Sequence, residues 1–136
     1  MKNENLVQEI NELHADICSA LADPTRILIL YKLSEQRLSV TELAAMLGIS
    51  QPAASRHLKV LRERGLVHSE RQGASIQYRL ADLRMIQVLD LLREVLHDRI
   101  QHRASLLESF ESGSISFEEN GLTKGAHIAY GQKNSR

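Results

Sequence analysis

The sequence predicts a mainly α-helical chain with one small β-hairpin, and three observations support this. Apolar residues recur at three- and four-residue steps through most of the first 110 positions, as they do in amphipathic helices. Between residues 66 and 80 the apolar residues instead alternate around the turn residues 72–75, which is typical of a hairpin. Before the hairpin pattern, two short helical patterns are separated by Gly48 and Ser50, which are a helix-stop and a helix-start signal.

Composition indicates one soluble domain with a modest core. Of 136 residues, 43% are hydrophobic and 25% are charged, which is ordinary for a globular protein. A single cysteine, Cys18, excludes an intrachain disulfide and a multi-cysteine metal site within one chain. We find no apolar run of about 18 residues and no signal-peptide pattern, so we expect a cytoplasmic protein. Because there is no Trp and few aromatics, a base-stacking platform for single-stranded nucleic acid is not expected.

Two helices are predicted before the central pair. Residues 6–22 form an amphipathic pattern, with Leu6, Ile10, Leu13, Ile17 and Leu21 on one stripe. Asp23 and Pro24 then start a second helix as N-cap and first-turn proline. That helix is apolar on most sides, with Ile27, Leu28, Leu30, Tyr31 and Leu33, so we expect it at the centre of the core. A short connection, 36–38, leads to the next helix.

The stretch from Ser39 to Leu66 reads as two short helices around a tight turn. Val40, Leu43, Ala44 and Leu47 form the apolar stripe of the first helix, which Gly48 ends in a left-handed conformation. Ser50 caps the second helix, where Ala54, Leu58 and Leu61 share one face and Pro52, Ser55, Arg56 and Lys59 the other. Two core helices with a solvated face would show the same spacing. A hairpin follows directly, however, and a helix-turn-helix followed by a hairpin is a winged helix-turn-helix.

The last predicted helix is long, starting at the cap Asp82 and running to about Phe110. We therefore expect residues 1–110 to form one domain and the Gly-, Ser- and Asn-rich residues 111–136 to form a flexible tail, with an ordered piece around 115–117 as an alternative. The terminal helices carry more apolar surface than a small domain needs, which predicts a homodimer through the first and last helices. The alternative is a monomer whose terminal helices cover its own core.

Charge is distributed unevenly although the net charge is zero. From Gln51 to Arg79 there are six basic and two acidic residues, whereas the first 22 residues hold one Lys and four acids. Because DNA phosphates respond to local charge, the basic stretch 51–79 favours the interpretation that its helix binds in the DNA major groove. A winged helix that serves only as a protein-interaction module remains a second hypothesis. An enzyme is disfavoured, because the sequence has no Gly-rich phosphate loop, paired carboxylates or nucleophile with a base.

Two segments together resemble one bacterial family. ALADPTRILILYKL (Ala20 to Leu33) and LAAMLGISQPAASRHLKVLRERGLV (Leu43 to Val67) resemble the ArsR family of winged-helix repressors, over about residues 13–102. The resemblance implies four helices, a hairpin and a fifth helix. It also implies a homodimer that binds an inverted-repeat operator on double-stranded DNA and is released by an inducer, here unidentified.

By that resemblance, Gln51, Ser55 and Arg56 read base edges, as suits amide, hydroxyl and guanidinium groups. Lys59, Arg62 and Arg71 hold phosphates, and Gln72 and Gly73 place the wing tip near the minor groove. Ser50 and Pro52 stand at the start of the reading helix, where backbone N–H groups meet a phosphate. His57 is interpreted as a buried, hydrogen-bonding histidine.

The family's metal patterns are not met. The family's thiolate pair would follow Glu42-Leu43, where Ala44-Ala45-Met46 stand, and Asp82 does not open an Asp-x-His motif. No metal or cofactor is therefore predicted. Two weaker alternatives remain, a metal or redox site at His14 and Cys18, and a site at Asp98 and His102 across a dimer with Asp90, Glu94 or His97. A disulfide between two Cys18 residues of a dimer is a further alternative, although the flanking apolar residues favour a buried Cys18.

Overall fold

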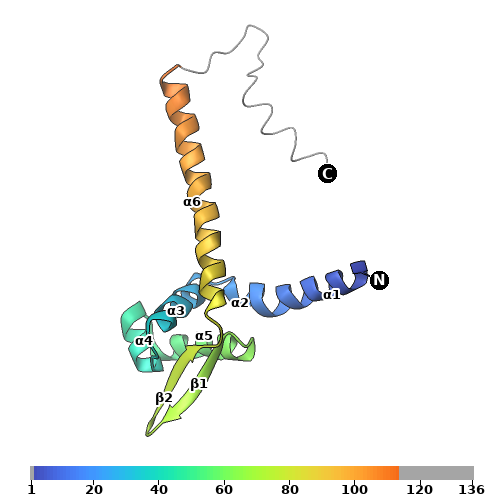
Figure 1. Ribbon diagram of the computed structural model, residues 1–136. Helices are drawn as coiled ribbons and strands as arrows, with labels where there is room; N and C mark the ends of the chain where they lie inside the picture. Colours follow the sequence, from blue (N-terminus) through green and yellow to red (C-terminus); the bar gives the residue numbers. More distant parts are fainter. Residues whose placement is uncertain (1, 114–136) are drawn as a thin grey trace. The chain divides into compact units, whose positions relative to one another are not determined.

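A computed structural model describes residues 2–113, and the predicted tail lies outside them from residue 114 onward. Its elements, drawn in Figure 1, are α1 (Lys2–Leu13), the π-helix η1 (His14–Cys18), α2 (Ser19–Leu21), α3 (Pro24–Glu35), α4 (Val40–Leu47), α5 (Gln51–Glu63), β1 (Val67–Gln72), β2 (Ser75–Leu80) and α6 (Arg84–Glu111). The chain divides into two compact units, residues 1–90 and 91–136. The first unit has the helix-turn-helix and hairpin of a winged helix, as predicted.

The predicted helix over residues 6–22 is wrong in its start and in its regularity. The helix begins at Lys2 and contains a π-helical turn before α2. The Ser19 hydroxyl donates to the Ala15 carbonyl, while the Ser19 backbone N–H donates to the carbonyl of His14. The Ser19 N–H thus bonds five residues back instead of four, which is the hydrogen bond of a π-helical turn.

The core of the first unit lies between α3, α4, α5 and the base of the hairpin. Ile29, Leu30, Leu43, Leu58, Leu61 and Val67 are its largest fully buried side chains. The prediction that α3 is central is confirmed by its contacts with α4, α5 and β2. Leu28 of α3 was expected in the core, but its side chain is 51% exposed.

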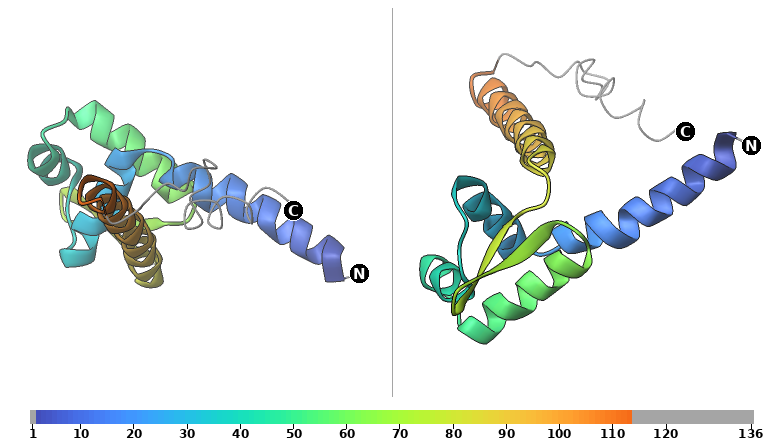
Figure 2. Two further views of the ribbon diagram at one scale, coloured as in Figure 1. Left: turned by 90° about the horizontal axis from the view of Figure 1, so that it is seen from above. Right: turned by 60° about the horizontal axis from the view of Figure 1, so that its bottom comes forward.

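The hairpin is tighter than the sequence predicted. β1 and β2 pair antiparallel from Val67 opposite Leu80 to Gln72 opposite Ser75, so the loop holds only Gly73 and Ala74. Gly73 has φ +61°, while Ala74 has negative φ, which is typical of a type II′ hairpin turn. Before α4, Leu38 forms an antiparallel bridge with Tyr78 that sequence reasoning missed. Figure 2 shows the hairpin beside α5, which contacts β1.

The start of α6 is tied to the first unit. The Asp82 carboxylate accepts the Arg84 backbone N–H at 2.9 Å, which confirms it as the cap of the last helix. The Tyr31 hydroxyl donates to Asp90 at 2.7 Å, which joins α3 to α6. Within residues 2–113 we find no helical segment with the length and apolar character of a membrane span.

Candidate DNA interface

The turn between α4 and α5 is defined by caps on both helices. Ser39 and Glu42 form a reciprocal capping box at the start of α4. Gly48 ends α4 with φ +65°, and the Ser50 hydroxyl accepts the Ala53 N–H at 3.2 Å to start α5. The backbone groups at both helix ends find their hydrogen-bond partners within a few residues along the chain. This explains why the sequence predicted the turn correctly.

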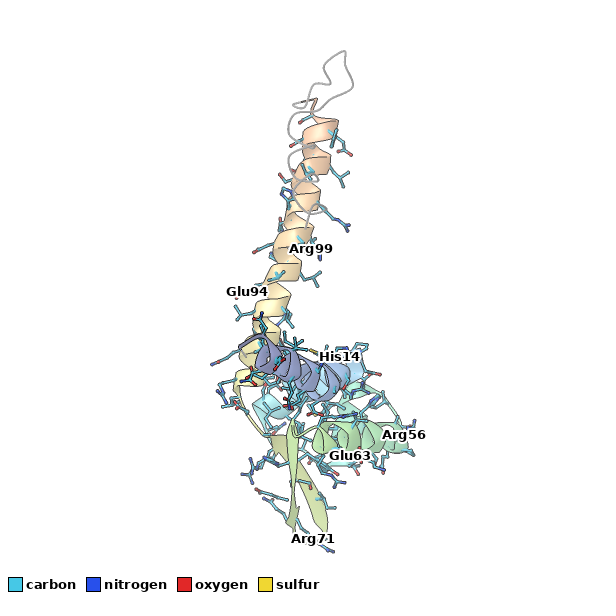
Figure 3. The ribbon with its side chains drawn as sticks, turned by 90° about the vertical axis from the view of Figure 1, so that its right-hand side faces the viewer. His14, Arg56, Glu63, Arg71, Glu94 and Arg99 are labelled. Carbon is cyan, nitrogen blue, oxygen red and sulfur yellow. The ribbon has the colours of Figure 1, made fainter. Side chains whose placement is uncertain are left out.

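The two faces of α5 differ sharply in exposure. Ala54, Leu58 and Leu61 are each 0% exposed, and these three side chains hold the helix against the core. The residues predicted to face DNA are all exposed: Ser50, Gln51, Pro52, Ser55, Arg56, Lys59 and Arg62. The exposed residues therefore lie on the open side of one helix, and Figure 3 labels Arg56 among them.

The cations of α5 and of its C-cap, Arg64, are not equally available for a phosphate or a base. Lys59 lies 4.0 Å from Glu63, and Arg64 pairs with Asp16 at 3.3 Å. Within residues 2–113, Arg56 and Arg62 have no acidic group within ion-pair distance. Their guanidinium groups can thus meet an anion without first breaking an internal pair.

The base of the wing is held by a charge network that sequence reasoning missed. Glu70 on β1 accepts from Arg79 at 3.0 Å and from Arg37 at 2.8 Å. The hydrogen bond from Arg79, followed by the charge of Arg37, holds the pKa of the Glu70 carboxyl below its usual value. Arg79 therefore adds less free positive charge than its place in the basic stretch suggested. Side chains alternate between the two faces of a hairpin, and Glu70 and Arg79 fall on the same face. This alternation is the sequence pattern from which their pairing could have been predicted.

The wing tip presents the remaining predicted residues. Arg71, Gln72 and Gly73 are all exposed, and Figure 3 shows Arg71 at the end of the hairpin. Among the described residues, no acid pairs with Arg71. Arg56 and Arg71 thus present two open guanidinium groups, one on α5 and one on the wing.

Two side chains differ from their predicted surroundings. Cys18 was expected to be buried, but it is exposed, because only Ala20 of its apolar neighbours reaches the core and Ile17 is half-buried. His57 is half-buried, and the described part of the chain shows no hydrogen bond to its ring, so its predicted pairing is not seen.

Neither of the two candidate metal-binding pairs, His14 with Cys18 or Asp98 with His102, has a third ligand beside it within residues 2–113. No three His, Cys, Asp or Glu side chains there come together as a metal site would need. His14 and Cys18 are both exposed at the two ends of the π-helical turn, and Asp98 and His102 are exposed on α6.

Comparison with known proteins places this geometry in a family. Residues 23–69 match the family described as bacterial regulatory protein, arsR family. Over 76 residues the chain is 46% identical to the HTH-type transcriptional regulator NmtR of Mycobacterium tuberculosis, a match that covers 56% of this chain and 63% of that protein. That is less than two thirds of the length of NmtR. Over 94 residues the chain is 39% identical to the HTH-type transcriptional repressor SmtB of M. tuberculosis, covering 68% and 70% of the two chains.

A solved structure agrees with these matches. The homodimeric winged helix-turn-helix DNA-binding domain of Mb0332 from Mycobacterium bovis, described as a possible ArsR-family transcriptional regulator, superposes with a TM-score of 0.63. It is 27% identical, and the match covers 71% of this chain and 88% of that one. From its sequence matches and its fold, the present chain belongs to the arsR family of bacterial regulatory proteins.

Proposed function

We propose that this chain is a homodimeric transcriptional repressor that binds an inverted-repeat operator through α5 and is released by an inducer that is not yet identified. The observation that carries the proposal is the exposed face of α5, which presents Gln51, Ser55 and Arg56 to solvent. The opposite face of the helix is buried in the core. An amide pairs with adenine and a guanidinium with guanine, so this face suits base-edge reading in the major groove. Its relatives named as transcriptional regulators and repressors support the same role.

Phosphate contacts come from the cations around that face. Lys59 and Arg62 flank the reading residues, and the N-terminus of α5 at Ser50 offers backbone N–H groups to a phosphate. Arg71 contributes from the wing. A protein that binds the chromosome in this way works in the cytoplasm.

Dimerisation is supported by apolar surface that a single chain leaves open. Four apolar residues of α1, Leu6, Val7, Ile10 and Leu13, are each about half exposed or more. The same holds for six residues of α6 between 91 and 107: Leu91, Leu92, Val95, Leu96, Ile100 and Leu107. A symmetric pair presents two reading helices, and a separation of about 34 Å matches one turn of DNA. The homodimeric state described for the M. bovis relative points the same way.

Selection from random duplex DNA followed by titration tests the proposal. The expected result is enrichment of a palindromic site that the purified protein binds at least ~10³-fold more tightly than random duplex at the same salt concentration. Sedimentation of the free protein should give a dimer at micromolar concentration. A protein that stays monomeric, or that binds random and selected duplexes equally, contradicts the proposal.

A second candidate concerns the signal, and the exposed Cys18 thiol favours it. In this form the repressor responds to a metal or an oxidant at His14 and Cys18, or to a metal at Asp98 and His102. The operator titration is repeated with divalent metals, a chelator, a reductant and an oxidant. A response that Cys18→Ser abolishes assigns the signal to the first pair, and a response that only His102→Ala abolishes assigns it to the second.

A further inference from the structure

One ion pair joins the N-terminal helical segment to the end of α5. The Arg64 Nη1 atom lies 3.3 Å from Oδ1 of Asp16, a residue 48 positions earlier in the sequence. Asp16 belongs to the π-helix η1, which directly continues α1. Arg64 is the C-cap of α5, and its backbone N–H donates to the Val60 carbonyl at 3.0 Å. The pair therefore connects the two parts of the chain to which the proposed function gives dimerisation and base reading.

The chain itself gives α1 little other support. Residues 3–16 are all exposed, and both views in Figure 2 show α1 extending away from the helix-turn-helix. The helix is anchored only at α2, where Ala20 is 0% exposed and its carbonyl accepts from Arg26. Between this anchor and α1 lies the π-helical turn, and such turns are among the places where helices kink. The direction of α1 relative to α5 therefore depends on side-chain contacts at the turn.

The pair of Asp16 and Arg64 is placed to supply that contact. Asp16 lies within the π-helical turn itself, at the point where a kink would change the direction of α1. Among the ion pairs formed by residues 3–113, only this one joins η1 to α5 or its C-cap. Its loss would leave the angle between α1 and α5 free to vary.

We propose that the Asp16–Arg64 pair fixes this angle and thereby selects the spacing between the two half-sites, the two arms of the inverted-repeat operator. The inference rests on the proposed function, in which α1 helps to join two protomers and each α5 reads one half-site. The distance and rotation between the two reading helices then follow from how each α5 is held relative to α1. Each base pair added between the half-sites moves one of them by ~3.4 Å and turns it by roughly 35°. A fixed angle thus admits one spacing, whereas a variable angle admits several.

The exposure of the pair sets the size of the expected effect. The side chains of Arg64 and Asp16 are 42% and 58% exposed. An exposed ion pair shifts an equilibrium by up to about fivefold, and a homodimer contains two copies of this pair. The two copies together can account for a roughly tenfold part of the spacing preference. Because salt screens exposed charges, this part should weaken as the salt concentration rises.

The experiment uses one selected operator whose half-sites stay constant while the central spacer is shortened or lengthened by one or two base pairs. The measured quantity is the ratio of the affinity at the selected spacing to the affinity at the neighbouring spacings. Asp16→Ala should lower this ratio by roughly five- to tenfold at low salt. Base discrimination within the half-sites should stay at the wild-type level, because the exposed face of α5 is unchanged, and it reports an intact fold.

Two further variants assign the effect to the pair. Glu12→Ala removes the same charge one helical turn earlier, from a side chain that accepts from Gln8 on the same helix, and it should leave the spacing ratio unchanged. Asp16→Arg combined with Arg64→Asp exchanges the two charges and keeps the net charge. This double variant should restore most of the ratio that either substitution alone removes, whereas a merely structural role of Asp16 would not be restored by the exchange.

The outcomes separate this inference from the proposed function. A wild-type spacing ratio in Asp16→Ala, an equal loss in Glu12→Ala, or an exchange variant that restores nothing overturns the role of the pair while operator binding itself stands. If no duplex is bound specifically, or the protein stays monomeric, the proposed function fails, and the spacing inference fails with it.

Discussion

The Arg26 side chain closes the helix that precedes its own, because its Nε donates to the Ala20 carbonyl at 2.6 Å. One terminal nitrogen also donates to the Ser19 carbonyl at 3.2 Å. Asp23, three residues earlier, caps the start of α3 by accepting the Thr25 N–H at 2.8 Å. In the Asp-Pro-x-Arg segment, Asp23 therefore caps the start of α3 and Arg26 caps the end of α2.

Replacing Arg26 should destabilise the first unit. The Arg26 side chain is only 16% exposed, and its loss leaves two helix-end carbonyls without their charged donor. We expect Arg26→Ala to lower the free energy of unfolding by about 1–3 kcal/mol and Arg26→Lys to lower it less. Urea denaturation at fixed chain concentration measures this, with the exposed Glu35→Ala as a control that should stay within about 0.5 kcal/mol. A change of similar size in both proteins would contradict the role of Arg26.

Arg56 and Lys59 should affect DNA binding in different ways. Arg56→Ala should cost about 1–3 kcal/mol on the selected operator and relax the preference for one base, because base contacts specify sequence. Lys59→Ala should weaken binding to every duplex and lower the slope of log K against log salt by about 0.9. Titrations on selected and random duplexes at several salt concentrations separate the two. Equal losses on both duplexes for Arg56→Ala would remove its base-reading role.

Glu63 limits the positive charge of the reading helix. Its carboxylate lies 4.0 Å from Lys59, and both side chains are more than half exposed. Glu63→Gln should raise the affinity for random duplex DNA several-fold at low salt and much less at high salt, because exposed charges are screened. Glu35→Gln at the end of α3 removes the same charge away from this pair, so an equal effect of the two substitutions would mean that net charge alone is responsible.

Asp82 should make stability depend on pH in the acid range. The hydrogen bond from the Arg84 side chain, and then that from the Arg84 backbone, lower the pKa of Asp82 from 3.8 to about 2. Because the pKa is lower in the folded chain, the stabilisation is complete above about pH 4 and is lost as the pH falls towards 2. The melting temperatures of the wild type and Asp82→Asn should differ by a constant amount from pH 7 to pH 5 and converge below pH 4. A difference that persists unchanged at pH 3 would show that the ion pair with Arg84 contributes nothing.

Gly48 should tolerate asparagine better than alanine. Its φ of +65° strains a residue with a Cβ, yet nothing lies within 4 Å of the position such an atom would occupy. The cost is therefore conformational, and Gly48→Ala should lower the free energy of unfolding by about 1–2 kcal/mol, with Gly48→Asn losing less. Urea denaturation compares the two variants. Equal losses would indicate that the backbone rearranges at this turn.

The sequence by itself determined the features whose partners lie within a few residues. Ser50 caps α5, Gly48 ends α4, and the spacing of Leu58 and Leu61 decides which side of α5 is buried. These outcomes depend on backbone geometry over one or two helical turns, so a local pattern is sufficient to predict them. The same pattern placed Arg56 on the open face.

Only the tertiary structure decided which charges remain available and which surfaces stay open. Arg79 is engaged by Glu70, Arg64 by Asp16, and Tyr31 reaches Asp90 across 59 positions of sequence. The register that sets Arg71 opposite Ile76 depends on a turn of two residues where four were expected. Pairing across such separations depends on where the packed elements bring side chains in space, and neither spacing nor composition specifies those positions.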